Sequence, residues 1–230
     1  MDWPFLLDVL RQLLSGLPLT LQLAGLSVLV GFLLATLVAS ARSSSIAPVR
    51  WIAQIHIEAF RGTPLLVQIF LIYYGLAQIP GLRHSFLWPF LREPFWCAIV
   101  ALSLNTSAYT AEIIRGALQS VPDGEIEAAR SCGMSGILLR RRIIWPIALR
   151  HGLPVYGSEI ILMFKATALT SVITLLEVTG IAYKLISSTY RALEIFVVAG
   201  AIYLTLTFLL SMTLSFVEKR LNAHHALRNT

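Results

Sequence analysis

The sequence predicts an all-α, polytopic membrane protein with five transmembrane helices. Hydrophobic residues make up 57% of its 230 residues, and charged residues only 13%. Soluble domains average roughly 45–50% apolar and about 25% charged residues. The low charge leaves too little polar surface for a soluble globule, and the high apolar content excludes a disordered chain. Two cysteines, Cys97 and Cys132, are too few for a disulfide framework or a cysteine-rich metal site.

Five apolar stretches are long enough to cross a bilayer, which takes about 20 helical residues. They cover residues 17–41, 51–79, 95–118, 153–173 and 195–217. We expect a short N-terminal segment over 1–16, a transmembrane domain over 17–218 and a tail over 219–230. The first stretch is too long, and the segment before it too acidic, for a cleavable signal peptide.

Positive charge predicts the orientation of the chain. Of its 18 Lys and Arg residues, 11 lie in the first and third connections between spans and in the tail, 5 lie on the other side, and Arg61 and Lys165 fall inside spans. Cytoplasmic loops of membrane proteins carry the excess of Lys and Arg. We therefore expect the N-terminus outside, the C-terminus inside, and a cytoplasmic loop over 120–150.

The loop over 120–150 contains a predicted amphipathic helix over 123–133. Asp123 and Glu125 stand in its first turn, where acidic side chains complement the helix dipole. Gly133 fits a helix end or a point of close packing. An ordinary connecting loop with a short solvated helix is the alternative interpretation.

Four segments together resemble the permease subunits of ABC importers. In the loop, Glu127-Ala128-Ala129, three further residues and then Gly133 resemble the EAA motif of that family. The other three segments are Phe-Arg-Gly-Thr-Pro-Leu-Leu-Val-Gln at 60–68, Asn-Thr-Ser-Ala-Tyr-Thr-Ala-Glu at 105–112 and Ser-Glu-Ile-Ile-Leu at 158–162. The resemblance covers about residues 15–218. It is strongest to the polar amino acid permeases that import histidine, lysine, arginine, ornithine, octopine and nopaline.

The resemblance implies the ABC type-1 permease fold in a bacterial inner membrane, with a periplasmic N-terminus and a cytoplasmic C-terminus. It implies that the chain forms half of a translocation pathway. The predicted helix then couples the chain to an ATPase dimer, through Asp123, Glu127, Ala128, Ala129 and Gly133. The other implied partners are a second permease subunit (identical or paralogous), a periplasmic solute-binding protein, membrane lipid and a small cationic amino acid or opine, with no nucleic acid.

The chain has no Gly-x-x-x-x-Gly-Lys-Ser/Thr phosphate loop. We therefore expect a transporter subunit rather than an enzyme, without catalytic residues, metal or cofactor of its own, and with ATP and Mg used by the separate ATPase. An ion-gradient-driven secondary transporter or channel is the alternative, but it would have no use for the EAA motif. A membrane enzyme fits less well, because no pair of nucleophile and base can be identified.

Glu159 is the sharpest candidate for substrate binding. It lies about nine residues into the fourth span if that span begins near Arg150, which places it about 13 Å deep and close to the midplane. Transporter sites often lie at that depth. A carboxylate there suits a guanidinium, ammonium or imidazolium group. The alternative is a structural ion pair with Arg61 or Lys165.

The other candidates are polar groups inside the second and third spans. Pro64 favours a break at Gly62-Thr63-Pro64, where freed backbone groups near Thr63 and Leu65 can face a ligand. Asn105 and Ser107 are further substrate candidates, or else packing contacts between helices. Glu112 favours pairing with Arg115 or another basic residue. The roles of Arg61 and Lys165 stay open.

Overall fold

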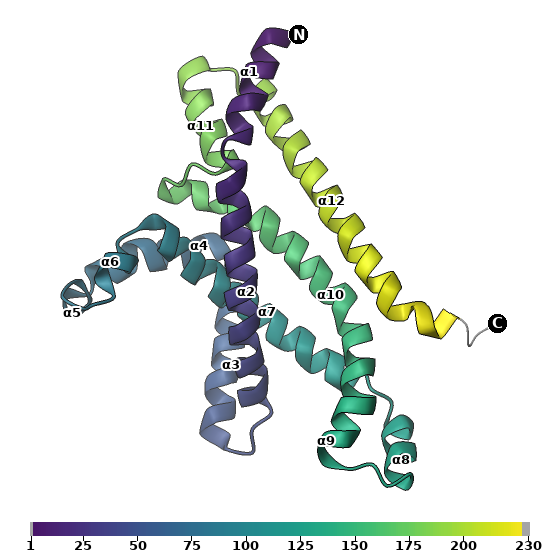
Figure 1. The fold of residues 1–230 in the computed structure, drawn as a ribbon. Coiled ribbons are helices and arrows are strands. Elements are labelled where there is room, and N and C mark those ends of the chain that lie inside the picture. The colour runs from purple at the N-terminus through teal and green to yellow at the C-terminus, as the bar shows by residue number, and fades with distance from the viewer. Residues whose placement is uncertain (1, 227–230) are drawn as a thin grey trace.

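The structure, a computed structural model, describes residues 2–226, and every regular element in that range is a helix (Figure 1). Within this part of the chain, three apolar helical stretches are each long enough to cross a membrane. The number rises to five if each of two bent helix pairs forms one span. The predicted fold class is confirmed. Of the expected tail, residues 227–230 lie outside the described range.

Helices α1 (Trp3–Leu14) and α2 (Leu17–Arg42) form one long apolar stretch over 3–42 (Figure 1). The sequence predicts only a short segment over 1–16, whereas most of it forms helix α1 in the structure. Val9 and Leu13 are both buried and lie one helical turn apart, so they form one apolar face. This helix has 12 residues, which is too short to be recognised as a transmembrane span from its hydropathy alone.

Helices α3 (Ala47–Gly62) and α4 (Leu65–Phe70) meet at an angle of 110°. Thr63 between them is extended, as expected for a residue before proline, and Pro64 has no N–H to continue the helix. The break lies at the predicted step, but it replaces one span over 51–79 with two helices. The chain continues through η1 (Leu71–Gly75), η2 (Leu76–Gln78), α5 (Pro80–Arg83) and α6 (Trp88–Leu91), which form an arm beside the bundle (Figure 1).

Helix α7 (Pro94–Gln119) is the centre of the bundle. In its most apolar window 67% of the residues are buried, against 33% for the α1–α2 stretch and 17% for the last helix. It packs against α2, α3, α4 and α10. Small residues such as Ala98, Ala101 and Ala108, all fully buried, allow this close approach.

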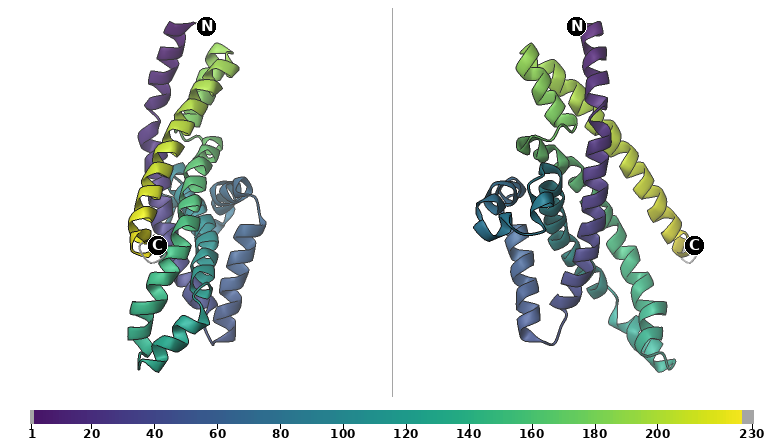
Figure 2. Two further views of the ribbon diagram at one scale, coloured as in Figure 1. Left: turned by 90° about the vertical axis from the view of Figure 1, so that its right-hand side faces the viewer. Right: turned by 60° about the vertical axis from the view of Figure 1, so that its left-hand side comes forward.

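Helices α8 (Asp123–Ser131) and α9 (Gly136–Leu139) lie at the end of the molecule far from the N-terminus (Figure 2). From α9 the chain runs through η3 (Arg140–Ile144) directly into α10 (Trp145–Ala166). The second half of the expected loop over 120–150 is therefore helical, and the fourth span begins before residue 153. Arginine is a good helix former, so three consecutive arginines do not end a helix, and polarity alone does not reveal this extension.

Beyond α10 come η4 (Thr167–Ile173), α11 (Val178–Thr189) and α12 (Ala192–Ala226). The η4–α11 turn bends the chain by 45°, and Thr174 has a positive φ of 68° in it. The buried Glu177 carboxylate caps α11 by accepting hydrogen bonds from the backbone N–H groups of Thr179 and Gly180, both at 2.8 Å. Helix α11 was not expected from the sequence.

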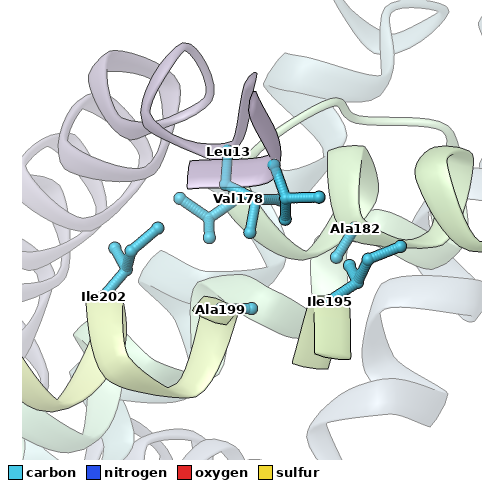
Figure 3. Packing of buried hydrophobic residues seen from close by; sticks show 7 residues of the cluster. Leu13, Val178, Ala182, Ile195, Ala199 and Ile202 are labelled. Atoms are coloured by element: carbon cyan, nitrogen blue, oxygen red, sulfur yellow. The ribbon is translucent and has the colours of Figure 1, made fainter. Parts of the chain in front are cut away.

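A buried apolar cluster joins α1, α11 and α12 (Figure 3). Its side chains converge from the three helices, and its members are Val9, Leu13, Val178, Ala182, Ile195, Ala199 and Ile202. The cluster fastens the first and last helices together at the N-terminal end. Helix α12 then diverges from α2 toward the C-terminal end (Figure 1).

Candidate functional site

A cleft of about 520 Å³ lies between α7 and α10, beside the end of α3. Its polar lining consists of Arg61, Tyr109, Glu112, Ser120, His151, Ser158 and Glu159. At one end His151 Nδ1 and Ser120 Oγ form a hydrogen bond of 2.7 Å. Ser120 directly follows α7 and lies three residues before α8. The cleft therefore extends along α7 from Glu159 toward the segment that carries the predicted coupling helix.

Glu159 is a nearly buried carboxylate on the wall of this cleft, with 8% of its surface exposed. Its Oε1 accepts a hydrogen bond of 3.0 Å from the hydroxyl of Thr106 on α7. Among the described residues no Lys, Arg or His nitrogen lies within 4 Å of it, so the alternative of an ion pair with Arg61 or Lys165 is not observed. A carboxylate inside a membrane is costly unless it is paired, and this one is available to a cation.

Glu112, which lines the cleft, contacts two arginines. Arg115, one turn further along α7, donates from Nη2 to Glu112 Oε2 at 2.6 Å and from Nε to both carboxylate oxygens at 3.1 Å. Arg61, in the last turn of α3, is 4.0 Å from the same Oε2. The Arg61 guanidinium also lies over the Tyr109 ring, 5.5 Å from its centroid. The predicted pairing of Glu112 with Arg115 is present.

The break between α3 and α4 is closed by Gln68, which is buried. Its amide nitrogen donates to the carbonyl of Phe60 at 2.9 Å, to the carbonyl of Thr63 at 3.0 Å and to the Thr63 hydroxyl at 2.9 Å. Asn105 on α7 donates to the Gln68 side-chain oxygen at 2.9 Å. The backbone carbonyls that the break releases are therefore satisfied inside the protein. Leu65 belongs to the neighbouring apolar cluster around Ile69.

The five predicted substrate residues do not gather at one place. Glu159 lines the cleft, whereas Thr63 and Asn105 take part in the network around Gln68. Ser107 faces α3, where its Oγ is 2.9 Å from His56 Nε2. Tyr109 and Ser158 line the cleft and were not singled out from the sequence. Tyr109, Glu112, Gly116 and Ser120 do recur at helical spacing, and that pattern was the available signal.

The predicted coupling residues lie on and just after α8. Asp123, Glu127 and Ala128 are exposed, while Ala129 is buried with 5% exposure. The helix ends in a Schellman motif with Gly133 at φ 78°. In this motif the N–H of Met134 donates to the carbonyl of Ala129 at 3.0 Å, and the N–H of Gly133 to that of Arg130 at 2.9 Å. The helix is therefore slightly shorter than the expected range of 123–133.

Residues 13–223 match the family model described as binding-protein-dependent transport system inner membrane component. The chain belongs to this family. It is a permease subunit of an ABC importer in the inner membrane and not itself an enzyme. This membership agrees with the resemblance carried by the EAA motif and by the three span segments.

Several relatives of the permease match it over almost the whole chain. The octopine transport system permease protein OccM of Rhizobium meliloti is 58% identical, over 93% of this chain and 87% of that protein. The nopaline transport system permease protein NocM of Agrobacterium fabrum is 50% identical, over 99% and 95%. The arginine ABC transporter permease protein ArtM of Haemophilus influenzae is 38% identical, over 94% and 95%.

Solved structures confirm the permease fold. A chain in the crystal structure of an amino acid ABC transporter with histidines superimposes with a TM-score of 0.85 at 39% identity, covering 96% of this chain and 99% of that one. A chain of the MetNI methionine ABC transporter, in an inward-facing conformation, gives a TM-score of 0.67 at 19% identity. The second similarity supports the fold alone.

Proposed function

We propose that the permease serves an ATP-driven importer of cationic amino acids or opines, and that Glu159 is the counter-charge for the substrate. The observation that carries this proposal is the environment of the Glu159 carboxylate. It is nearly buried, it accepts a hydrogen bond from one hydroxyl, and it lines the wall of a cleft. A neutral substrate would leave that charge uncompensated. Octopine, nopaline and arginine, the compounds named for the three relatives, all carry a guanidinium group that suits a carboxylate.

The pathway also needs partners that this chain does not contain. Two permease subunits, identical or paralogous, would enclose the pathway, two ATPase subunits would use ATP and Mg, and a periplasmic binding protein would deliver the substrate. The α8 surface with Asp123, Glu127 and Ala128 supports a role in ATPase docking, because it is exposed and α8 begins three residues after Ser120, which lines the cleft. Gly133 ends that helix and Ala129 anchors it.

Transport then follows from alternating access. ATP binding closes the ATPase dimer, α8 moves with it, and the spans repack so that Glu159 faces the periplasm. Hydrolysis returns the cleft to the cytoplasmic side. Each step requires the substrate or the nucleotide to bind the two states with different affinity. The excess of Lys and Arg around α8 supports a cytoplasmic position for this end and a periplasmic N-terminus.

The test is uptake by the reconstituted complex with Glu159→Gln. We expect the KM for labelled arginine, histidine or octopine to rise about 10–100-fold, because a hydrogen bond to a charged group contributes about 1.5–3 kcal/mol. Uptake of glutamine should change less. The matched control is Glu58→Gln on α3, an exposed carboxylate that is hydrogen-bonded to Gln54 and lies outside the cleft. Unchanged cation uptake by an assembled Glu159→Gln complex would refute the role of Glu159.

A further inference from the structure

Among the described residues, the lining of the cleft includes the carboxylates of Glu159 and Glu112 and the guanidinium of Arg61. Glu112 is already held by Arg115 through three hydrogen-bond contacts of 2.6–3.1 Å. Arg61 makes the weaker contact, since its nitrogen is 4.0 Å from Glu112 and its side chain is 45% exposed. Arg115 therefore fixes the position of Glu112, and the Glu112 carboxylate also attracts the guanidinium of Arg61.

Arg61 lines the cleft with a side chain that is only partly buried. It lies in the last turn of α3, next to Gly62 and the break at Thr63. Besides Glu112, its described contact is the face of the Tyr109 ring at 5.5 Å. The other carboxylate that lines the same cleft is Glu159, which has no cationic partner within the part of the chain that the structure describes.

From this arrangement we infer that Glu112 is a positioning residue for cation specificity: together with Tyr109 it holds Arg61 away from Glu159. A guanidinium in a partly buried site requires a counter-charge. Without Glu112, Arg61 turns to Glu159 and occupies the position of the substrate cation. The permease would then be inhibited by its own arginine. The inference rests on the proposed role of Glu159 and adds a second residue to the same site.

The decisive experiment compares Glu112→Gln with two double variants in the reconstituted complex. If Arg61 occupies Glu159 in about nine of ten molecules of Glu112→Gln, the apparent KM for arginine rises about tenfold, because the competent fraction falls to about one tenth. Adding Arg61→Gln to Glu112→Gln should return the KM to the level of Arg61→Gln alone. Adding Arg115→Gln instead should give no such recovery, because Arg115 does not line the cleft.

Two results would overturn the inference. One is an unchanged KM in Glu112→Gln, and the other is recovery through Arg115→Gln rather than Arg61→Gln, which would show that Glu112 serves only its own helix. If Glu112→Gln fails to assemble with the ATPase, Tyr109→Leu tests the same idea by removing the ring beneath Arg61. That variant should also raise the KM, by a smaller factor, and Arg61→Gln should reverse the rise; a rise that Arg61→Gln leaves in place would refute the inference.

The Glu159→Gln variant, measured in the same series, separates the two proposals. Suppose that Glu159→Gln loses cation uptake, but that adding Arg61→Gln to Glu112→Gln does not restore the KM. This combination refutes the positioning role of Glu112 and leaves the role of Glu159 standing. Unchanged cation uptake in Glu159→Gln refutes the proposed counter-charge and with it the basis of the positioning role.

Discussion

Gly31 on α2 has no room for a side chain, because a β-carbon there would lie 2.1 Å from Cγ2 of Thr106 on α7. The same Thr106 donates its hydroxyl to Glu159 at 3.0 Å. One missing methyl group on α2 therefore allows the contact that orients the candidate substrate carboxylate on α10. Thr106 therefore serves both the packing of α7 against α2 and the hydrogen bonding of Glu159.

Gly31→Ala should therefore affect both stability and transport. Overpacking of a tight contact costs about 1–3 kcal/mol, and the displaced threonine would loosen its bond to Glu159. We expect a lower melting temperature of the purified complex and a higher KM for arginine. Gly25→Ala on the same helix is the matched control, since a β-carbon there meets no atom within 4 Å. Equal behaviour of the two variants would contradict the proposed path from Gly31 to Glu159.

Residues 105–107 show how much of the site the sequence can predict. Three consecutive polar residues in a span indicated a functional or packing role, but successive residues of a helix point about 100° apart. Asn105 reaches Gln68, Thr106 reaches Glu159 and Ser107 reaches His56. Which of the three approaches the cleft depends on the rotation of α7 against its neighbours, and no local pattern records that rotation.

At the scale of elements, helix breaks were predictable where proline marks them. The break at Thr63 follows from Pro64, and hydropathy located the body of each span. Helices α1 and α11 escaped prediction because they are short, and their stability comes from tertiary packing in one shared cluster. The extension of α10 through η3 escaped because three arginines suggested a loop. These elements depend on distant contacts rather than on their own composition.

The end of α8 supports a prediction about coupling. Gly133 has a φ of 78°, where an alanine costs about 1 kcal/mol or more, so Gly133→Ala should fray the Schellman motif. We expect faster hydrogen exchange at the N–H groups of Gly133 and Met134, and fewer substrate molecules imported per ATP. Gly124→Ala, in the first turn of the same helix with open space around it, should leave both unchanged or improve them. A Gly133→Ala complex with faster exchange but normal coupling would show that this helix end is not needed for docking.

At the scale of the whole molecule, the residues of the candidate site are distributed along one cleft that leads toward α8. A single cleft along α7 is lined by Glu159, by Glu112 and, at the end nearest α8, by Ser120 and His151. Helix α8 begins three residues after Ser120. In the proposed cycle, a movement of α8 is transmitted through the end of α7 to Glu112 on that helix and, across the cleft, to Glu159 on α10. Helices α1, α11 and α12 are joined at the opposite end by their own cluster (Figure 3). In the proposed cycle of alternating access, this cluster belongs to the fixed end of the molecule and α8 to the moving end.

The native cysteines test the proposed orientation of the chain, in which α8 lies on the cytoplasmic side. Cys132 is exposed beside α8, whereas Cys97 has 1% exposure inside α7. A membrane-impermeant maleimide should therefore label Cys132 in inside-out vesicles and leave right-side-out vesicles unlabelled, and Cys132→Ser should abolish the signal. Binding of the ATPase subunits should slow the labelling, because they cover α8. Labelling from the periplasmic side would reverse the assigned topology, and equal labelling with and without ATPase would place the docking surface elsewhere.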